Sequence, residues 1–436
     1  MKNEENNNSY DYTYITDNSQ KCDKNGAFFL TDLNERYLED AKNRGCTNIL
    51  SANEVSKILG IKDNIKIIGI TGTNGKTTTA AAMYSILLDL NIKVGFQGTR
   101  GCFINDSQIA KKGLTTPTIF ETMLNIKKAI DEGCKYFIME VSSHAIAQNR
   151  VDGLDFYLKI FTNVTQDHLD YHKSLENYIQ IKSSFFSDEC MKLINKDDTK
   201  IVFNPKNCKT YGIENNATYK ILAYSLNEGI SAALAKIEKV YDFTSPMHGF
   251  FNLYNITAAI SAVDILEVAT IEQICEAVEN FAGVAGRMEI VSEKPLIIVD
   301  FAHTPDGMEK VLDSMKSKDI VVVFGAGGDR DKNKRAKMGF IASKFAKKII
   351  VTSDNPRSED PQKIIEDILQ GIKNPKSTVV ISDREKALEE AIKWQEKDEV
   401  LLILGKGDET YQEINGEKIP FDDREIIKNL IKNRIE

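Results

Sequence analysis

Short apolar runs alternate with segments of helical spacing over most of the chain. The apolar run at residues 65–70 is followed by a glycine loop and then by the alanine-rich stretch 80–88, which together predict a strand, a loop and a helix. Two further apolar runs, at residues 135–139 and 159–164, predict later strands. Strands that alternate with helices are typical of a parallel sheet, so we expect an α/β domain that begins near residue 61.

A second series of apolar runs begins after residue 286. Helical segments separate most of these runs, and each run ends in polar or glycine residues. The five runs are residues 296–300, 320–325, 348–354, 378–383 and 400–405. This pattern predicts a second α/β domain with a doubly wound sheet.

The start of the chain has a weaker pattern. Residues 1–9 are polar and Asn-rich, which predicts a frayed tail, and residues 14–15 and 27–30 predict short strands. A helix is predicted at residues 37–43. A chain of 436 residues is too long for one core, so we expect three domains. Their expected bounds are residues 1–60, 61–285 and 286–436.

Composition excludes several classes of protein. The net charge of −8 argues against a general nucleic-acid binder, and there is no run of about 18 apolar residues that would predict a membrane span. The first fourteen residues lack the apolar core of a secretory signal. Seven cysteines without a Cys-x-x-Cys pair suit reduced thiols rather than disulfides or a zinc site. We expect a cytoplasmic monomer that acts on small molecules.

The loop at residues 70–79, ITGTNGKTTT, carries the strongest chemical signal. Gly72 and Gly75 allow backbone N–H groups to turn inward, and the helix N-terminus adds a partial positive charge. Lys76 is then placed to reach the β- and γ-phosphates of a nucleotide, and the Thr77 hydroxyl to hold Mg²⁺. Ile70 stands where the eight-residue phosphate-loop pattern has its first glycine, so an ordinary glycine turn is the alternative.

Two later strands of the same predicted domain end in residues that can bind a metal. Glu140 follows the strand at 135–139, and His168 follows the strand at 159–164. Ligands of parallel sheets gather at the carboxyl ends of strands, so both residues are expected to share a crevice with Thr77. A hydroxyl, a carboxylate and an imidazole beside phosphates predict a magnesium site. The alternative is a surface glutamate and a hydrogen-bonded loop histidine.

Two helices carry polar residues that the pattern alone does not assign to a site. Lys182 lies in a predicted helix at residues 175–186, where spacing alone predicts a solvent-exposed lysine. Asn252 and Asn255 lie on the first turn of an apolar helix. They can cap this helix, which is the default role, or bind a base or phosphate.

Eleven short motifs, taken together and in order, resemble those of the Mur ligases, in particular the members that attach the third residue of the peptidoglycan stem peptide. They are GTNGKTT, TTP, EVSSHA, DHLDYH, YIQIK, FNLYN, GRME, DFAHTPD, FGAGGDRDKNKR, DNPRSEDP and GKGDETYQ. The resemblance covers the chain from about residue 61. It implies a small UDP-binding N-terminal domain, a central ATPase domain with a phosphate loop, and a C-terminal Rossmann-like domain that binds the amino acid.

The activity that this resemblance implies is an ATP-dependent amide ligation. The free carboxylate of D-Glu in UDP-N-acetylmuramoyl-L-Ala-D-Glu takes the γ-phosphoryl group of ATP, and the amine of the incoming amino acid displaces phosphate from the acyl phosphate. The Asp-Asn-Pro-Arg sequence that ends at Arg357 goes with meso-diaminopimelate in the family. Lysine is the alternative amino acid. A guanidinium can hold the extra carboxylate of diaminopimelate with two hydrogen bonds, which lysine cannot offer.

The resemblance also implies roles for individual residues. Thr77 and Glu140 match ligands of the Mg²⁺ that accompanies ATP, His168 matches a ligand of a second Mg²⁺, and Lys182 matches a lysine that the family carries as a carbamate. Lys76, Lys182, His168 and Arg287 match catalytic positions. The matching ATP-binding positions are Gly72, Thr73, Asn74, Gly75, Lys76, Thr77, Thr78, Asn252, Arg287, Asp300 and His303.

Two further sets of residues match substrate-binding positions. For the UDP-muramoyl peptide they are Ser19, Thr115, Thr116, Ser142, Gln148 and Arg150. For diaminopimelate they are Arg330, Asp354, Asn355, Arg357, Gly405 and Glu409. Arg330 would hold the carboxylate beside the reacting amine, and Glu409 would accept from the distal ammonium.

The chain departs from the family pattern at two places. Asp408 stands where the family usually has histidine, and residues 17–20 match the family's Asp-Ser-Arg only loosely. Two other functions share part of this pattern. A folate polyglutamylating ligase shares the phosphate loop and the carbamate motif but not TTP or DNPRSEDP, and a catalytically silent ATP-binding scaffold would not need Lys76, Glu140, His168 and Lys182 together.

Overall fold

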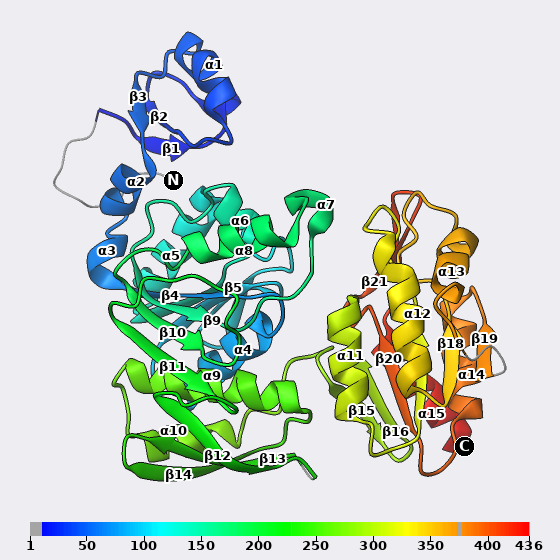
Figure 1. The fold of residues 1–436 in the computed structure, drawn as a ribbon. Helices are drawn as coiled ribbons and strands as arrows, with labels where there is room; N and C mark the ends of the chain where they lie inside the picture. Colours follow the sequence, from blue (N-terminus) through cyan, green and yellow to red (C-terminus); the bar gives the residue numbers. More distant parts are fainter. Residues whose placement is uncertain (1–10, 228, 374–376, 436) are drawn as a thin grey trace.

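The computed structural model describes residues 11–227, 229–373 and 377–435, so the polar stretch at 1–9 lies outside the described residues. Three α/β units follow one another, each built on its own sheet, which confirms the predicted fold class (Figure 1). The first unit lies at one end of the second, and the third lies beside the second. None of the described helices is long and apolar enough to cross a membrane.

The N-terminal unit is a small parallel sheet with short helices. Its strands β1, β2 and β3 pair in that order, and the aromatic side chains of Phe28 and Phe29 on β2 are fully buried. The predicted strands and helix of this region are confirmed within a few residues. The elements are β1 (Tyr14–Thr16), β2 (Gly26–Phe29), α1 (Leu38–Asn43), β3 (Asn48–Leu50), α2 (Ala52–Ile58) and α3 (Ile61–Asn64).

The central unit has an eleven-stranded sheet in the order β14-β13-β12-β11-β10-β9-β4-β8-β5-β6-β7. The strands from β12 to β5 run parallel, and antiparallel strands close both edges. The strands are β4 (Lys66–Thr71), β5 (Val94–Gly98), β6 (Gly101–Ile104), β7 (Ser107–Ala110), β8 (Tyr136–Glu140), β9 (Phe156–Phe161), β10 (Met191–Asn195), β11 (Cys208–Gly212), β12 (Tyr219–Ser225), β13 (Ile230–Lys236) and β14 (Lys239–Ser245).

Helices cover both faces of this sheet and form two separate cores. One core contains side chains of α4, α9 and α10, and the other contains side chains of α5 and α8. Burial on both faces explains why the central strands are continuous apolar runs rather than alternating ones. The helices are α4 (Lys76–Asp89), α5 (Ile119–Asp131), α6 (Ser143–Ala147), α7 (Leu169–His172), α8 (Leu175–Ser184), α9 (Phe250–Ile265) and α10 (Ile271–Val278).

The C-terminal unit is doubly wound, with the strand order β15-β16-β20-β17-β18-β19. All neighbours are parallel except β15 and β16. Helices α11, α12 and α13 pack on one face, and α14 and α15 on the other. The elements are β15 (Glu289–Glu293), β16 (Leu296–Asp300), α11 (Pro305–Ser314), β17 (Ile320–Phe324), α12 (Asn333–Phe345), β18 (Lys348–Val351), α13 (Pro361–Leu369), β19 (Thr378–Val380), α14 (Arg384–Trp394), β20 (Val400–Leu404), β21 (Tyr411–Ile414), β22 (Glu417–Pro420) and α15 (Asp423–Ile435).

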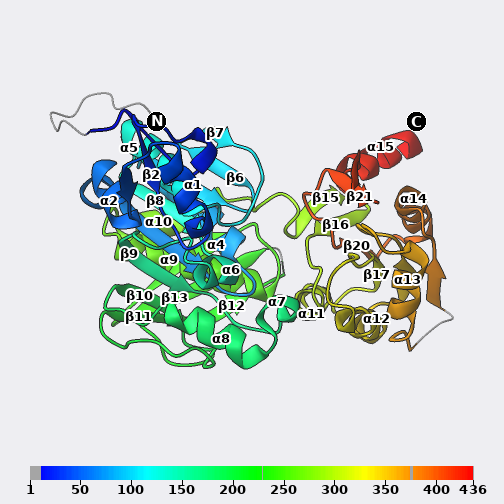
Figure 2. The same cartoon turned by 90° about the horizontal axis from the view of Figure 1, so that it is seen from above.

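Helix α11 lies on the side of the C-terminal unit that faces the central unit (Figures 1 and 2), and its first turn contacts the phosphate loop. Asp306, at the start of α11, accepts hydrogen bonds from Asn74 Nδ2 at 2.7 Å and from Thr165 Oγ1 at 3.0 Å. The carboxyl ends of β4 and β9 therefore lie close to the C-terminal unit.

Candidate active site

The predicted phosphate loop joins β4 to α4, and Lys76 is the first residue of the helix. Gly75 has a φ of +86°, and a Cβ there would lie 2.3 Å from Asn255 Oδ1. A Cβ on Gly72 would lie 1.9 Å from Thr162 Oγ1. The loop is thus pressed against α9 and the end of β9, which only glycine permits. Lys76 Nζ donates to the Gly72 carbonyl at 2.7 Å, and burial lowers the pKa of Lys76.

Glu140 ends β8 with its side chain fully buried beside the phosphate loop. Its Oε2 accepts a hydrogen bond from Thr77 Oγ1 at 2.9 Å, and its Oε1 accepts one from the Thr99 backbone N–H at 3.0 Å. A Cβ on Gly98 would lie 2.2 Å from Glu140 Oε1. The carboxylate is therefore held from three sides, and it presents oxygen next to a hydroxyl, as a hard cation requires.

His168 lines a cavity between the central and C-terminal units together with Thr77 and Glu140, so the structure brings the three residues to one space, as predicted from their strand ends. Its Nε2 is 3.3 Å from Asp167 Oδ2, and its ring packs edge-on against His144 at a centroid distance of 4.9 Å. The side chain is 44% exposed, and partial loss of hydration lowers the pKa of His168, which favours the neutral imidazole that can act as a ligand.

Lys182 is buried, with only 1% of its surface exposed, so the exposed position predicted from helical spacing is wrong. Helix α8 packs so that Lys182 Nζ lies beneath the phosphate loop, where it donates to the Gly72 carbonyl at 2.9 Å and to Thr71 Oγ1 at 3.3 Å. Burial, aided by the charge of Lys76, places the pKa of Lys182 well below its ordinary value. The residue is thus a buried amine that favours its neutral form.

The C-terminal unit contributes three predicted residues to the same cavity: Arg287, Asp300 and His303. Asp300 ends β16 and accepts backbone hydrogen bonds at both carboxylate oxygens, 2.7 Å each, and burial raises the pKa of its carboxyl group. The guanidinium of Arg287 lies 4.1 Å from the centroid of the Phe301 ring. Burial lowers the pKa of His303 to about 4.

The cavity between the two units has a volume of about 590 Å³. The phosphate loop lines one side, and the residues after β16 line the other. Of the predicted ATP-binding residues, those that line it are Thr73, Asn74, Gly75, Lys76, Thr77, Thr78, Arg287, Asp300 and His303. A space of this size with a glycine-rich loop at the N-terminus of α4 suits a nucleotide.

Asn252 is not among the lining residues, whereas Asn255 is. The expectation that these asparagines cap the helix is wrong, because Gly249 occupies the N-cap and no side chain caps α9. Asn252 Nδ2 donates to the His248 carbonyl at 2.7 Å, and its Oδ1 accepts from Asn255 Nδ2 at 3.0 Å. Asn252 therefore contacts the cavity wall through Asn255.

Asp197 and Tyr254 also line the cavity, although neither was predicted as a site residue from the sequence. Asp197 accepts backbone hydrogen bonds from Ile213 at 2.6 Å and Glu214 at 2.9 Å, and it accepts from the Tyr254 hydroxyl at 2.9 Å. It ties the loop after β11 to α9. A signal was present, since β10 also ends in polar residues, but no motif pointed to it.

Most of the residues predicted for the UDP-muramoyl peptide form one hydrogen-bonded cluster beside the end of β8. They are Thr116, Ser142, Gln148 and Arg150. Thr115 precedes Thr116, and its hydroxyl lies 3.2 Å from Thr99 Oγ1. Thr116 Oγ1 donates to the Glu140 carbonyl at 2.9 Å and accepts from the Ser142 N–H at 3.0 Å. Arg150 donates to the Thr116 carbonyl at 3.0 Å. Ser19 lies apart from them, buried in the N-terminal unit against Asp40.

A second cluster lies at the carboxyl ends of β18 and β20. Asn355 Nδ2 donates to Glu409 Oε2 at 2.8 Å, and buried Lys406 donates to the same oxygen at 3.1 Å. Gly405 has a φ of +113°, and a Cβ there would lie 2.6 Å from Asp354 Oδ2. The structure therefore brings these predicted diaminopimelate residues together. Gly405 also donates its N–H to the Asp300 carbonyl, which connects this cluster to the nucleotide cavity.

Arg357 borders this cluster with 23% of its side chain exposed. Its guanidinium donates to the Gly328 carbonyl at 2.7 Å and pairs with Glu413 Oε2 at 3.2 Å. Glu413 lies in β21, outside every motif, so sequence reasoning could not find it. Arg330 is exposed and donates only weakly, to the Asp329 carbonyl at 3.4 Å, so the structure does not bond it to the other members.

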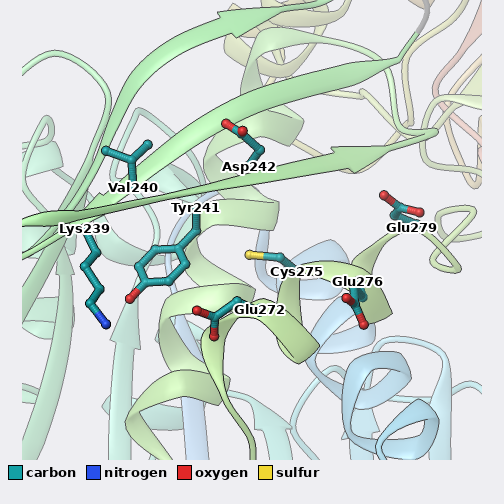
Figure 3. Close-up of a pocket in the computed structure, with 8 residues that line it drawn as sticks. All are labelled: Lys239, Val240, Tyr241, Asp242, Glu272, Cys275, Glu276 and Glu279. Carbon is teal, nitrogen blue, oxygen red and sulfur yellow. The ribbon is translucent and has the colours of Figure 1, made fainter.

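A second cavity, of about 500 Å³, lies between β14 and α10 and contains none of the predicted residues (Figure 3). Four carboxylates surround it, from Asp242, Glu272, Glu276 and Glu279. Cys275 points toward it, and burial raises the pKa of this thiol to about 12. None of the described residues that line this second cavity belongs to a glycine-rich loop at a helix N-terminus, whereas the interdomain cavity has such a loop, so the interdomain cavity is the better nucleotide site.

The amino-acid sequence of the chain and its fold are both similar to those of known proteins. The description of the Mur ligase middle domain matches residues 70–263, and that of the Mur ligase glutamate ligase domain matches residues 286–407. The chain is 53% identical to a UDP-N-acetylmuramoyl-L-alanyl-D-glutamate–2,6-diaminopimelate ligase of Wolinella succinogenes, over 96% of each chain. It is 50% identical to the protein of the same name from Helicobacter pylori, over 97% of this chain and 96% of that one. A solved structure of such a ligase is 28% identical, with a TM-score of 0.70, and covers 98% of this chain and 96% of its own.

Proposed function

The chain belongs to the Mur ligase family, and from this we propose that it joins meso-diaminopimelate to the D-Glu γ-carboxylate of UDP-N-acetylmuramoyl-L-Ala-D-Glu at the expense of ATP, in peptidoglycan synthesis. The observation that carries this function is the cavity between the central and C-terminal units, because the phosphate loop of one unit and Arg287, Asp300 and His303 of the other line the same space. Lysine is not favoured as the amino acid, since the relatives at 50–53% identity are named for diaminopimelate.

The reaction needs phosphoryl transfer because a carboxylate is a poor electrophile. The carboxylate oxygen of D-Glu attacks the γ-phosphorus of ATP and ADP leaves. The amine then attacks the acyl carbon, loses a proton, and expels inorganic phosphate. Phosphoryl transfer depends mainly on positioning and on charge neutralisation, for which we assign Lys76 and Arg287. Asp300 would accept hydrogen bonds from the ribose hydroxyls.

We assign the Mg²⁺ that accompanies ATP to Thr77 and Glu140, whose oxygens lie 2.9 Å apart. A Mg²⁺ on ATP takes several of its ligands from phosphates and water, so two protein oxygens fit it, and it would neutralise phosphate charge. Within the described ranges no three His, Cys, Asp or Glu side chains gather as a self-sufficient metal site. His168 lies on the same cavity and is our candidate for a second Mg²⁺.

We also propose that Lys182 carries a carbamate. Carbamate formation requires a neutral amine, and burial lowers the pKa of Lys182, which favours that form. The modification converts the neutral amine into an anion beneath the phosphate loop, next to the Gly72 carbonyl. An anion there can orient Mg²⁺, which an ammonium group cannot do.

In the C-terminal cluster we assign Arg357 to the distal carboxylate of diaminopimelate, Glu409 to the distal ammonium and Arg330 to the carboxylate beside the reacting amine, together with Asp354, Asn355 and Gly405. The cluster at Thr116 and Arg150 is assigned to the muramoyl peptide. Ser19 remains our candidate for the UDP end, and the monomeric state and the cytoplasmic location remain predictions.

An amino-acid panel tests the function. The purified protein is given ATP, Mg²⁺, UDP-N-acetylmuramoyl-L-Ala-D-Glu and one of meso-diaminopimelate, LL-diaminopimelate or L-lysine, and both phosphate release and product mass are followed. We expect product with meso-diaminopimelate and no phosphate release when the dipeptide is omitted. Equal product formation with lysine would refute the choice of amino acid, and phosphate release without either substrate would indicate a simple ATPase.

A further inference from the structure

Asp408, the residue that departs from the family histidine, forms an ion pair across two structural units. Its Oδ1 lies 3.1 Å from Lys112 Nζ of the central unit, with 15% and 34% of the two side chains exposed. Lys112 lies three residues before Thr115, in the loop that leads into the muramoyl-peptide cluster. Asp408 immediately precedes Glu409 of the amino-acid cluster. The ion pair thus connects the two loops that we assign to the acid and to the amine.

The backbone beside Asp408 has no room to move independently of the rest of the C-terminal unit. A Cβ on Gly286 would lie 2.1 Å from the Asp408 nitrogen, and a Cβ on Gly407 would lie 2.7 Å from Phe301 Cβ. Moving the Asp408 carboxylate therefore moves the whole loop at residues 405–409 and not Asp408 alone.

Lys112 also lies near Phe301, which lines the nucleotide cavity. Its Nζ lies 5.8 Å from the centroid of the Phe301 ring, and the guanidinium of Arg287 lies 4.1 Å from the same ring. Arg424 adds a second positive charge that acts on Asp408. A carboxylate at position 408 is attracted by both cations, whereas a neutral histidine would not be.

We propose that Lys112 and Asp408 are positioning residues that align the muramoyl-peptide loop with the amino-acid loop when the central and C-terminal units close. The proposal rests on the proposed function for the identity of the two loops. Neither residue takes part in the chemistry. The pair acts by setting the distance between the acyl carbon and the attacking amine, for which small displacements have large effects on rate.

A charge-reversal cycle tests the pair. We compare the wild type with Lys112→Glu, Asp408→Lys and the double variant, and we measure kcat/KM for the amino acid and KM for all three substrates. Each single variant places like charges together and is expected to lower kcat/KM about fivefold, in the range of partly exposed ion pairs. The double variant restores opposite charges at positions 112 and 408 but leaves the repulsion by Arg424, so its kcat/KM should lie above that of either single variant. A double variant that shows the product of both single losses would overturn the proposal.

Lys344 and Glu309 provide a matched control, because they form an ion pair at 2.8 Å between α12 and α11 within the C-terminal unit. Reversing either of them should leave kcat/KM unchanged. Small-angle scattering with ATP alone reads domain closure without ligation: Lys112→Glu should increase the radius of gyration and the double variant should reduce it again, and no change in Lys112→Glu would count against the proposal. A wild type that closes with ATP but does not ligate diaminopimelate would refute the proposed function, while the scattering comparison of the variants would still test the ion pair.

Discussion

Replacing Arg357 with alanine removes the guanidinium that we assign to the distal carboxylate of diaminopimelate. The backbone there is held independently of the side chain, because the Arg357 N–H donates to the Glu413 carbonyl at 3.0 Å and the Arg357 carbonyl accepts from Asn415 at 2.7 Å. The variant should therefore keep its fold. Two of the guanidinium's donor groups contact Gly328 and Glu413, so others are available for a substrate carboxylate.

The magnitude follows from the pair that is lost. Removing one partner of a largely buried, hydrogen-bonded charge pair costs about 2–5 kcal/mol, which corresponds to a loss of roughly 30-fold to several thousand-fold in kcat/KM for diaminopimelate. Lysine lacks the distal carboxylate and does not use this contact, so its already low kcat/KM should change little.

The assay is steady-state phosphate release with each amino acid at saturating ATP and dipeptide, confirmed by product mass. Glu413→Gln serves as the control, because it removes the charge that neighbours Arg357 but keeps the guanidinium, and its diaminopimelate activity should fall much less. Equal losses for diaminopimelate and lysine in Arg357→Ala would refute the assignment.

Four other changes probe the site and its frame. Gly98→Ala should push the Glu140 carboxylate away from its hydroxyl partner, since the new Cβ would lie 2.2 Å from Oε1, and should raise the Mg²⁺ concentration needed for half-maximal activity roughly 10- to 100-fold, as measured by Mg²⁺ titration. Lys182→Ala should abolish ligation, and added formate or acetate should restore part of it by supplying an anion. The pKa of His303, lowered by burial from 6.5 to about 4, means that the unfolded chain binds more protons between these values, so stability should fall as the pH drops from 6.5 towards 4, and less steeply in His303→Asn when urea unfolding is followed. Arg384→Met leaves the fully buried carboxylate of Asp423, which pairs with the Arg384 guanidinium at 2.8 Å, without its partner. The free energy of unfolding should fall by about 3–5 kcal/mol in urea titrations.

Each of these expectations has an outcome that contradicts it. An unchanged Mg²⁺ titration in Gly98→Ala would separate Glu140 from metal binding. Lys192→Ala is the control for Lys182, because Lys192 is a fully buried lysine that bonds the Cys190 carbonyl at 2.7 Å away from the cavity, and acids that restored both variants equally would argue against a carbamate. Parallel stability curves for His303→Asn and the wild type, or an Arg384→Met variant as stable as the wild type, would refute the corresponding burial arguments.

Much of the fold could be predicted because strand and helix signals are local. The apolar runs at 65–70, 135–139 and 159–164 became β4, β8 and β9, and the five later runs became the parallel strands of the C-terminal sheet. Strand ends also predicted a shared cavity, because parallel strands direct their carboxyl ends to one edge. The convergence of Thr77, Glu140 and His168 follows from that rule alone.

Spacing along the chain does not show what packs against a helix, and that limit explains the errors. Helical periodicity predicted an exposed Lys182, but α8 lies under the phosphate loop and buries it. Asn255 rather than Asn252 lines the cavity, because the orientation of α9 is set by the sheet it covers. Glu413 could not be found at all, since its partner Arg357 is 56 residues away in the chain.

The sequence by itself determined which segments become strands, where a phosphate loop stands and which residue types meet at the strand ends, because these depend on neighbours within a few residues. Only the tertiary structure decided which of those groups are buried, which hydrogen bonds they make and how the pairs Asn74–Asp306 and Lys112–Asp408 join two units, since these contacts span more than 200 residues. Burial then shifts the pKa values of Lys182 and His303, and that property belongs to the folded molecule.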